Sequence, residues 1–326
     1  RRNKSGCGND LEYKFARGNG GGNARNKLDA DAAFVPAAFR SASDSRDAAQ
    51  SAKEHRMSIP HETFPSAWAI RRSGLADYYE LTKPGVTSLI IFATMVGFYL
   101  GSAEGMQYLL LAHTLLGTAL VAGGTAALNQ FWERDADSKM WRTRNRPLPT
   151  GRLAPWKALL FGVAMAVGGI IYLCWKVNPL SGLLAALTLA SYLFLYTPLK
   201  TRTPLCTLVG SFPGAVPPLI GWAAARGSLD AVAWVLYAIL FLWQFPHFFS
   251  IAWLYRDDYE RAGIVMLPVV EPDGESTARQ IVVFAAVLLP VSLIPTWLGA
   301  TGTIYFAGSL ILGIAFLSFA VRTALI

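Results

Sequence analysis

Apolar residues gather into long runs after residue 80, and short polar segments separate one run from the next. A membrane-spanning helix needs about 20 mostly apolar residues. Eight stretches reach that length, near residues 84–103, 107–128, 156–175, 179–198, 207–226, 231–253, 279–298 and 303–321. The pattern therefore predicts an all-α fold, a polytopic membrane helix bundle.

The fifth stretch is the one that we expect to be interrupted. It contains Pro213, Pro217 and Pro218, and proline removes a backbone donor and clashes with the preceding turn of a helix. Membrane helices tolerate such breaks where neighbouring segments satisfy the freed backbone groups. We expect residues 207–226 to form a kinked or broken span.

The beginning of the chain has a different character. Residues 1–65 are rich in Gly, Asn, Ala, Ser and charged residues and contain no apolar run, which is typical of disorder. A mitochondrial transit peptide is poor in acids, whereas Asp and Glu recur throughout this segment. Residues 1–70 are therefore predicted to be a disordered or non-native tail, and residues 75–326 the membrane domain.

The distribution of charged residues predicts how the bundle is oriented in the membrane. Only 15% of the 326 residues are charged, against about 25% in soluble chains. The net charge of +8 would suggest a nucleic-acid partner in a soluble protein. After residue 80, however, every Lys and Arg except Lys176 and Arg226 falls on one side of the predicted spans. Positive loops stay in the cytoplasm, so topology explains the charge, the partner is the lipid bilayer, and no nucleic acid is needed.

An ordered set of oxygen ligands ends the second stretch. Asn129, Glu133 and Asp137 are spaced four residues apart, which places all three on one stripe of a helix. Such a stripe suits Mg²⁺, which is held by carboxylates together with substrate phosphates. Arginines, whose guanidinium groups fit phosphate oxygens, follow at once: Arg142, Arg144 and Arg146. The pattern outlines a diphosphate site, and the alternative is a solvated loop that only orients the span.

A second acidic cluster follows the sixth stretch. Asp257 and Asp258 lie on the same side of the membrane as the first stripe, so the two clusters together could bracket a diphosphate through one or two Mg²⁺ ions. Adjacent residues point about 100° apart on a helix, so we expect only one of them to bind metal directly. His247 lies inside the sixth stretch, and a polar ring within a span is a functional candidate. The alternative is a histidine hydrogen-bonded within the bundle.

Further side chains on the cytoplasmic side are candidates for substrate binding. They are Lys83 before the first stretch, Lys200 and Arg202 between the fourth and fifth, and Tyr255 after the sixth. Their basic members are also what the positive-inside rule expects of any loop. The sequence leaves both interpretations open.

Four stretches together carry a family resemblance: residues 81–84, 129–152, 196–222 and 243–268. They resemble the UbiA family of intramembrane prenyltransferases. Within that family, Glu133 and the run Trp243-Gln-Phe-Pro-His247 look like the branch that prenylates heme. The resemblance implies nine membrane helices around a central cavity, so a ninth is expected beyond Ile326. It also implies a bacterial inner (cell) membrane location in preference to the mitochondrial inner membrane.

The resemblance implies the chemistry as well. Farnesyl diphosphate would alkylate a vinyl group of heme b, water would add, and heme O and diphosphate would result, with Mg²⁺ as cofactor. Heme A synthase or cytochrome oxidase assembly would then be downstream partners.

The acceptor could instead be an aromatic acid or a quinone precursor. A membrane transporter is the alternative from another class, since transporters often show internal repeats with interrupted helices. Here the two acidic clusters on one face favour cytoplasmic chemistry instead.

Overall fold

The computed structural model describes residues 74–102 and 105–325. These residues form helices joined by short loops, and they contain no strand. The prediction of an all-α membrane helix bundle is confirmed. The predicted tail over residues 1–70 lies outside the described residues and stays a prediction.

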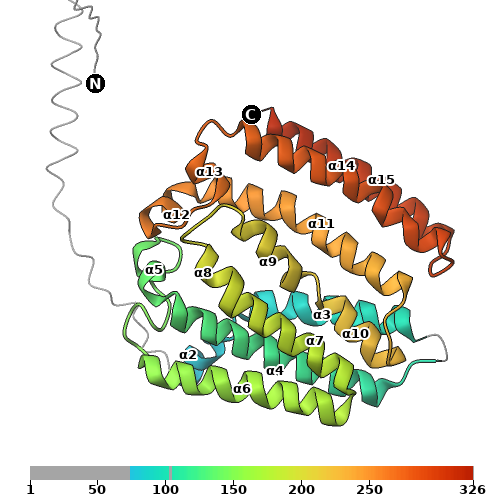
Figure 1. Cartoon of the computed structure of the whole chain (residues 1–326), viewed down its shortest axis with the longest axis horizontal. Coiled ribbons are helices and arrows are strands. Elements are labelled where there is room, and N and C mark those ends of the chain that lie inside the picture. Colours follow the sequence, from blue (N-terminus) through green and yellow to red (C-terminus); the bar gives the residue numbers. More distant parts are fainter. Residues whose placement is uncertain (1–73, 103–104, 326) are drawn as a thin grey trace, which may run out of the picture. The chain divides into compact units, whose positions relative to one another are not determined.

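Eight segments of the described chain are long and apolar enough to cross a membrane, one for each predicted stretch. Five of them are uninterrupted helices: α3 (Pro84–Gly101), α4 (Tyr108–Trp132), α6 (Pro155–Lys176), α14 (Glu275–Trp297) and α15 (Thr303–Ala324). A sixth is α11 (Ala231–Leu254), which runs beside α14 in Figure 1. The remaining two segments are interrupted.

The fifth span breaks where its prolines predict. Helix α9 (Cys206–Gly214) ends just after Pro213, and α10 (Pro217–Arg226) begins on Pro217 and Pro218. Figure 1 shows the two pieces joined by a non-helical link. Proline is well tolerated in the first turn of a helix, where its missing N–H has no partner to lose. The prediction of an interrupted span is therefore confirmed.

The fourth span contains an irregularity that the apolar pattern does not reveal. Helix α7 (Pro179–Ala190) continues into a π-helical segment, η1 (Ser191–Tyr196), and then into α8 (Thr197–Leu199). The backbone N–H of Thr197 donates to the carbonyl of Tyr192, five residues back. Such wide turns are rare and often lie at functional sites. Here the segment leads directly into Lys200.

Close helix contacts in the bundle depend on glycine. A side-chain carbon added at Gly97 of α3 would lie 2.1 Å from the carbonyl oxygen of Pro218 in α10. One added at Gly221 of α10 would lie 1.9 Å from the carbonyl oxygen of Thr94 in α3. Small residues let membrane helices approach to backbone contact, so this pair of glycines sets the distance between α3 and α10.

Short helices cap one end of the bundle, where α4 and α11 finish. They are α2 (Gly74–Leu81), α5 (Arg134–Lys139), α12 (Arg256–Ala262) and α13 (Leu267–Val270). Helices α5 and α12 pack against each other there, as Figure 1 shows. The two acidic clusters predicted from the sequence therefore lie at the same end of the molecule.

Candidate functional site

The predicted stripe of oxygen ligands forms as a continuous face. Asn129 lies in the last turn of α4, Glu133 at the junction with α5, and Asp137 within α5. The N–H of Glu133 donates to the carbonyl of Asn129 at 2.9 Å, and that of Asp137 to the carbonyl of Glu133 at 2.8 Å. Helical hydrogen bonding thus crosses the junction and keeps the three side chains aligned. Asn129 and Asp137 are each only 1% exposed.

Two lysines from distant segments meet this stripe. Lys83 Nζ donates to Asn129 Oδ1 at 2.7 Å. Lys200 Nζ donates to Glu133 Oε1, also at 2.7 Å, and lies 4.5 Å from the centre of the Tyr196 ring. The predicted substrate-binding residues Lys83 and Lys200 are therefore beside the predicted metal ligands.

An arginine completes the set of cations. Arg146 Nη1 donates to both carboxylate oxygens of Asp137, at 2.8 and 2.7 Å. Thr143 supports the same turn through a hydrogen bond from its hydroxyl to the carbonyl of Asp137 at 2.9 Å. A guanidinium has five N–H donors, so Arg146 keeps donors for a further anion while it holds Asp137.

Burial and neighbouring charge perturb the groups of the stripe. Burial lowers the pKa of Lys83 from 10.5 to about 7, and the nearby Arg146 acts in the same direction. Burial alone would raise the pKa of Glu133, but the charges of Lys200 and Lys83 outweigh it and hold that pKa below its ordinary value. Lys200 and Arg146 balance the two carboxylates. Lys83 adds positive charge when it is protonated, and an anionic ligand beside it would favour that form.

Lys83 adopts a backbone conformation that few residues other than glycine accept. Its φ of 48° and ψ of 63° lie in the left-handed region, and it is the only non-glycine residue with positive φ among those described. Such conformations carry a free-energy cost and persist where the surroundings impose them. Gln130 of α4 is one such constraint, because its amide nitrogen donates to the carbonyl of Leu81 at 3.0 Å.

An ion-pair cluster holds α2 at the same place. Arg152 Nε lies 3.0 Å from the buried Asp77 carboxylate, and Arg152 Nη2 lies 2.9 Å from that of Glu80. These links tie α2 to the loop that precedes α6. Sequence reasoning missed this role for Arg152, because in the sequence it is one more basic residue in a basic loop.

The second acidic cluster divides into two different carboxylates. Asp258 is 7% exposed and accepts hydrogen bonds from the backbone N–H groups of Trp141 at 3.1 Å and Arg142 at 3.4 Å, and from Arg261. Burial opposes its ionisation, but these hydrogen bonds lower the pKa of Asp258. The Asp257 side chain is 79% exposed and lies 3.4 Å from Arg256.

The other predicted site residues Arg142, Arg144, Arg202 and Tyr255 have contacts of a different kind. The Arg142 guanidinium lies 4.9 Å from the centre of the Tyr255 ring, and that of Arg144 lies 3.8 Å from the centre of the Trp141 ring. Arg202 is exposed in the turn after Lys200. Direct hydrogen bonds to the stripe come from Lys83, Arg146 and Lys200.

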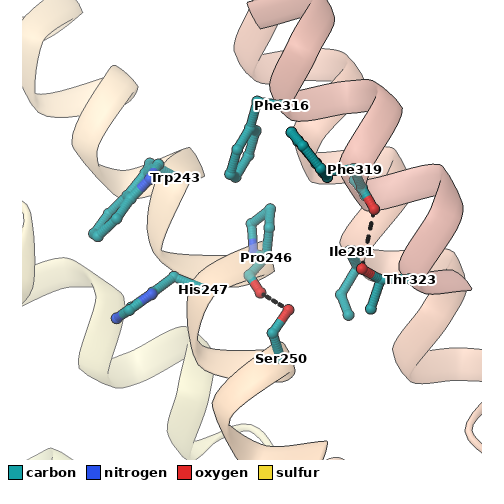
Figure 2. A pocket seen from close by; sticks show the side chains of 9 residues that line it. Trp243, Pro246, His247, Ser250, Ile281, Phe316, Phe319 and Thr323 are labelled. Carbon is teal, nitrogen blue, oxygen red and sulfur yellow. Dashed lines mark hydrogen bonds between the residues drawn. The ribbon is translucent and has the colours of Figure 1, made fainter. Parts of the chain in front are cut away.

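His247 lies on α11 in an aromatic setting. Its ring stacks on that of Trp243, with centres 4.6 Å apart and an angle of 15° between the planes. Figure 2 shows both residues beside a pocket of about 210 Å³ that Phe316, Phe319 and other residues of α15 line from the opposite side. Within the described chain no hydrogen bond to the imidazole is present. The contact that the imidazole makes there is the stacking on Trp243, and the role of His247 stays a prediction.

The chemistry of the stripe fits a hard cation. Its donors are two carboxylates and one amide oxygen, which suit Mg²⁺. Across residues 74–102 and 105–325, no three His, Cys, Asp or Glu side chains gather closely enough to hold a metal by themselves. Ligand oxygens from a substrate would therefore have to complete the coordination, which is the usual arrangement for Mg²⁺ on phosphates.

Comparison with known proteins defines the class. Residues 90–325 match the model of the UbiA prenyltransferase family, so the chain belongs to that family. This confirms the predicted class, a multi-pass membrane prenyltransferase.

Individual relatives narrow the comparison. A protoheme IX farnesyltransferase of Solibacter usitatus is 55% identical over 260 residues, covering 77% of this chain and 89% of that protein. Another, of Aquifex aeolicus, is 41% identical over 249 residues, covering 76% and 85%. Both relatives carry the name of the heme-prenylating branch, which is the branch that the sequence motifs indicate.

Solved structures show the same fold at low sequence identity. The structure of a digeranylgeranylglyceryl phosphate synthase aligns with a TM-score of 0.64 at 17% identity, covering 77% of this chain and 90% of that one. A UbiA homologue of Archaeoglobus fulgidus, bound to DMAPP and Mg²⁺, aligns with a TM-score of 0.59 at 15% identity, covering 76% and 86%. Both comparisons concern the fold alone.

Proposed function

We propose that this chain transfers the farnesyl group of farnesyl diphosphate to a vinyl group of heme b, giving heme O and diphosphate. The relatives named as protoheme IX farnesyltransferases support this acceptor and donor. The observation that carries the donor half is the convergence of Lys83, Lys200 and Arg146 on one stripe. These cations come from three separate parts of the chain and meet at one end of the bundle.

The cations stabilise the leaving group. When the allylic C–O bond breaks, negative charge develops on the departing diphosphate, and fixed positive groups aimed at that charge lower the barrier. Lys200 and Arg146 are already held at the stripe by Glu133 and Asp137, so they need little reorganisation to meet a phosphate.

Asn129, Glu133 and Asp137 are the residues that would hold Mg²⁺, and a bound ion would supply further positive charge against the diphosphate. In the second cluster, Asp258 is held by backbone N–H groups, which cannot turn to a phosphate as the side-chain partners of Glu133 and Asp137 can. Asp257, whose side chain is 79% exposed, is the carboxylate left to contact metal there. Arg142, Arg144, Arg202 and Tyr255 form the outer margin of the same phosphate site.

The acceptor half of the reaction needs no protein nucleophile. The vinyl carbon of heme attacks the allylic carbon, diphosphate leaves with the electrons of the C–O bond, and water captures the resulting cation with loss of a proton. His247 contacts the heme as an axial ligand or as a propionate partner. Its imidazole is without a hydrogen bond in the described chain and stacks on Trp243 beside an apolar pocket.

The end of the bundle that carries the stripe faces the cytoplasm of a bacterial cell. Basic residues gather at this end, as the positive-inside rule requires. Farnesyl diphosphate would enter from the aqueous side, while the apolar product would leave through the bilayer toward heme A synthase or cytochrome oxidase assembly.

Product mass tests this function. Membranes that contain the chain are incubated with heme b, farnesyl diphosphate and Mg²⁺, and the extracted porphyrins are analysed by mass spectrometry. We expect a species heavier than heme b by one farnesyl group and one hydroxyl group, and none from membranes carrying the Glu133→Gln variant. Prenylation of an added aromatic acid or quinone precursor, with heme b unchanged, would assign the chain to another branch of the family.

A further inference from the structure

The loop that carries Arg142, Arg144 and Arg146 is held in part by a helix from a distant region of the chain. It runs from Met140 to Arg146, between α5 and the polar segment before α6. Its internal hydrogen bonds begin with the N–H groups of Thr143 at 3.2 Å and Arg144 at 2.9 Å, both donated to the carbonyl of Met140. The N–H groups of Trp141 and Arg142 precede this turn, so they have no partner within it.

Asp258 supplies those partners from a helix more than one hundred residues away. Its Oδ1 accepts the N–H of Trp141 at 3.1 Å, and its Oδ2 accepts the N–H of Arg142 at 3.4 Å. Carboxylates play the same role at helix N-termini, where they accept the first free N–H groups. In this chain the capping carboxylate belongs to a different element.

A second contact fixes the carboxylate itself. Arg261, one turn along α12, donates to Asp258, and its guanidinium lies 5.9 Å from the centre of the Trp141 ring. Arg144 lies on the same ring at 3.8 Å. The side chain of Trp141 is thus placed against two arginines while its backbone is held by Asp258.

The geometry points to Asp258 as a positioning residue that braces the Trp141–Arg146 loop and thereby aims Arg146 at the diphosphate. The effect of Asp258 on catalysis rests on the proposed function. The bracing of the loop by Asp258 does not depend on that function. Two of its three hydrogen bonds come from backbone N–H groups, whereas Glu133 and Asp137 are held by side-chain cations that a phosphate can also engage. The second acidic cluster therefore acts on the first motif through the backbone, and Asp258 serves as a brace rather than as a metal ligand.

Limited trypsin digestion in EDTA tests the brace without metal or substrate. We expect trypsin to cleave after the exposed Arg142 and Arg144 when the loop leaves its folded conformation, and cleavage after Lys157, in the first turn of α6, to report unfolding of that helix. Hydrogen bonds to a charged group are the strong ones, so Asp258→Ala should speed cleavage at the two arginines by about tenfold or more. Asp258→Asn keeps one oxygen acceptor and should give an intermediate rate. Both variants should leave Lys157 protected.

Glu260→Gln is the matched control. Glu260 is exposed on the same helix as Asp258, and its replacement by Gln removes the same negative charge. In this variant we expect the loop to be cleaved at the rate of the parent. A loop that stays protected in Asp258→Ala contradicts the brace. Cleavage that increases equally after Lys157 in both Asp258 variants also contradicts it, because a local brace predicts selective release.

Kinetics separate positioning from metal binding. Asp258→Asn should raise KM for farnesyl diphosphate, leave KM for heme b unchanged, and leave the half-saturating Mg²⁺ concentration at saturating donor as in the parent. A raised Mg²⁺ requirement with a protected loop would make Asp258 a metal ligand and overturn the inference. If the parent forms no heme O, the proposed function fails, while the digestion still decides whether the brace exists.

Discussion

Replacement of Arg146 by lysine separates charge from geometry at the diphosphate site. One nitrogen of Arg146 donates to both oxygens of Asp137, at 2.8 and 2.7 Å, which leaves other N–H groups for a phosphate. A lysine ammonium is a compact point charge without this fork. It keeps the buried Asp137 neutralised, so the protein should still fold, but it cannot hold the carboxylate and a phosphate in the same way.

The expected loss is about one hydrogen bond between charged groups. Such a bond contributes about 1.5–3 kcal/mol, which corresponds to roughly 10- to 150-fold weaker binding of farnesyl diphosphate. Arg146→Ala would confuse the measurement, because removal of one partner of a buried pair costs about 3–5 kcal/mol of stability. Even with a discount for the 23% exposure of the Arg146 side chain, that loss would obscure the binding effect.

Calorimetry with a non-hydrolysable farnesyl diphosphate analogue measures the donor affinity, and the absorbance of bound heme measures the acceptor affinity. The control is Arg134→Lys, the same chemical change on α5, where the guanidinium lies 5.0 Å from the centre of the Phe131 ring. We expect weaker donor binding in Arg146→Lys alone, with unchanged heme binding. Unchanged donor affinity would refute the reasoning, and an equal loss of both affinities would indicate misfolding instead.

Three further predictions concern other parts of the molecule. Glu133→Gln should abolish turnover while the protein still inserts into membranes, and a normal rate at limiting Mg²⁺ would remove Glu133 from the site. His247→Ala should shift or bleach the bound-heme spectrum and leave diphosphate binding intact; an unaltered spectrum would identify His247 as a packing residue. Gly221→Ala should destabilise the bundle by at least about 1–3 kcal/mol in thermal unfolding, because the added carbon would lie 1.9 Å from the carbonyl oxygen of Thr94. A carbon added at Gly168 would have no neighbour within 4 Å, so the Gly168→Ala variant should unfold at nearly the same temperature as the parent.

The sequence by itself determined the features that depend on neighbours along the chain. Apolar length predicts membrane spans because the bilayer core sets how many residues a helix needs, and each predicted span is present. Helical periodicity placed Asn129, Glu133 and Asp137 on one stripe, since four residues make little more than one turn. Proline chemistry located the break in the fifth span for the same local reason.

Only the tertiary structure decided which distant groups meet. The sequence could not distinguish Asp257 from Asp258, because the difference lies in the N–H groups of Trp141 and Arg142, which reach Asp258 across the fold. The partner of Asn129 was hidden for the same reason, since Lys83 reaches it from the turn before α3. Spacing describes one helix face at a time, whereas pairing between faces depends on how helices pack, and close glycine contacts rather than any local pattern set that packing here.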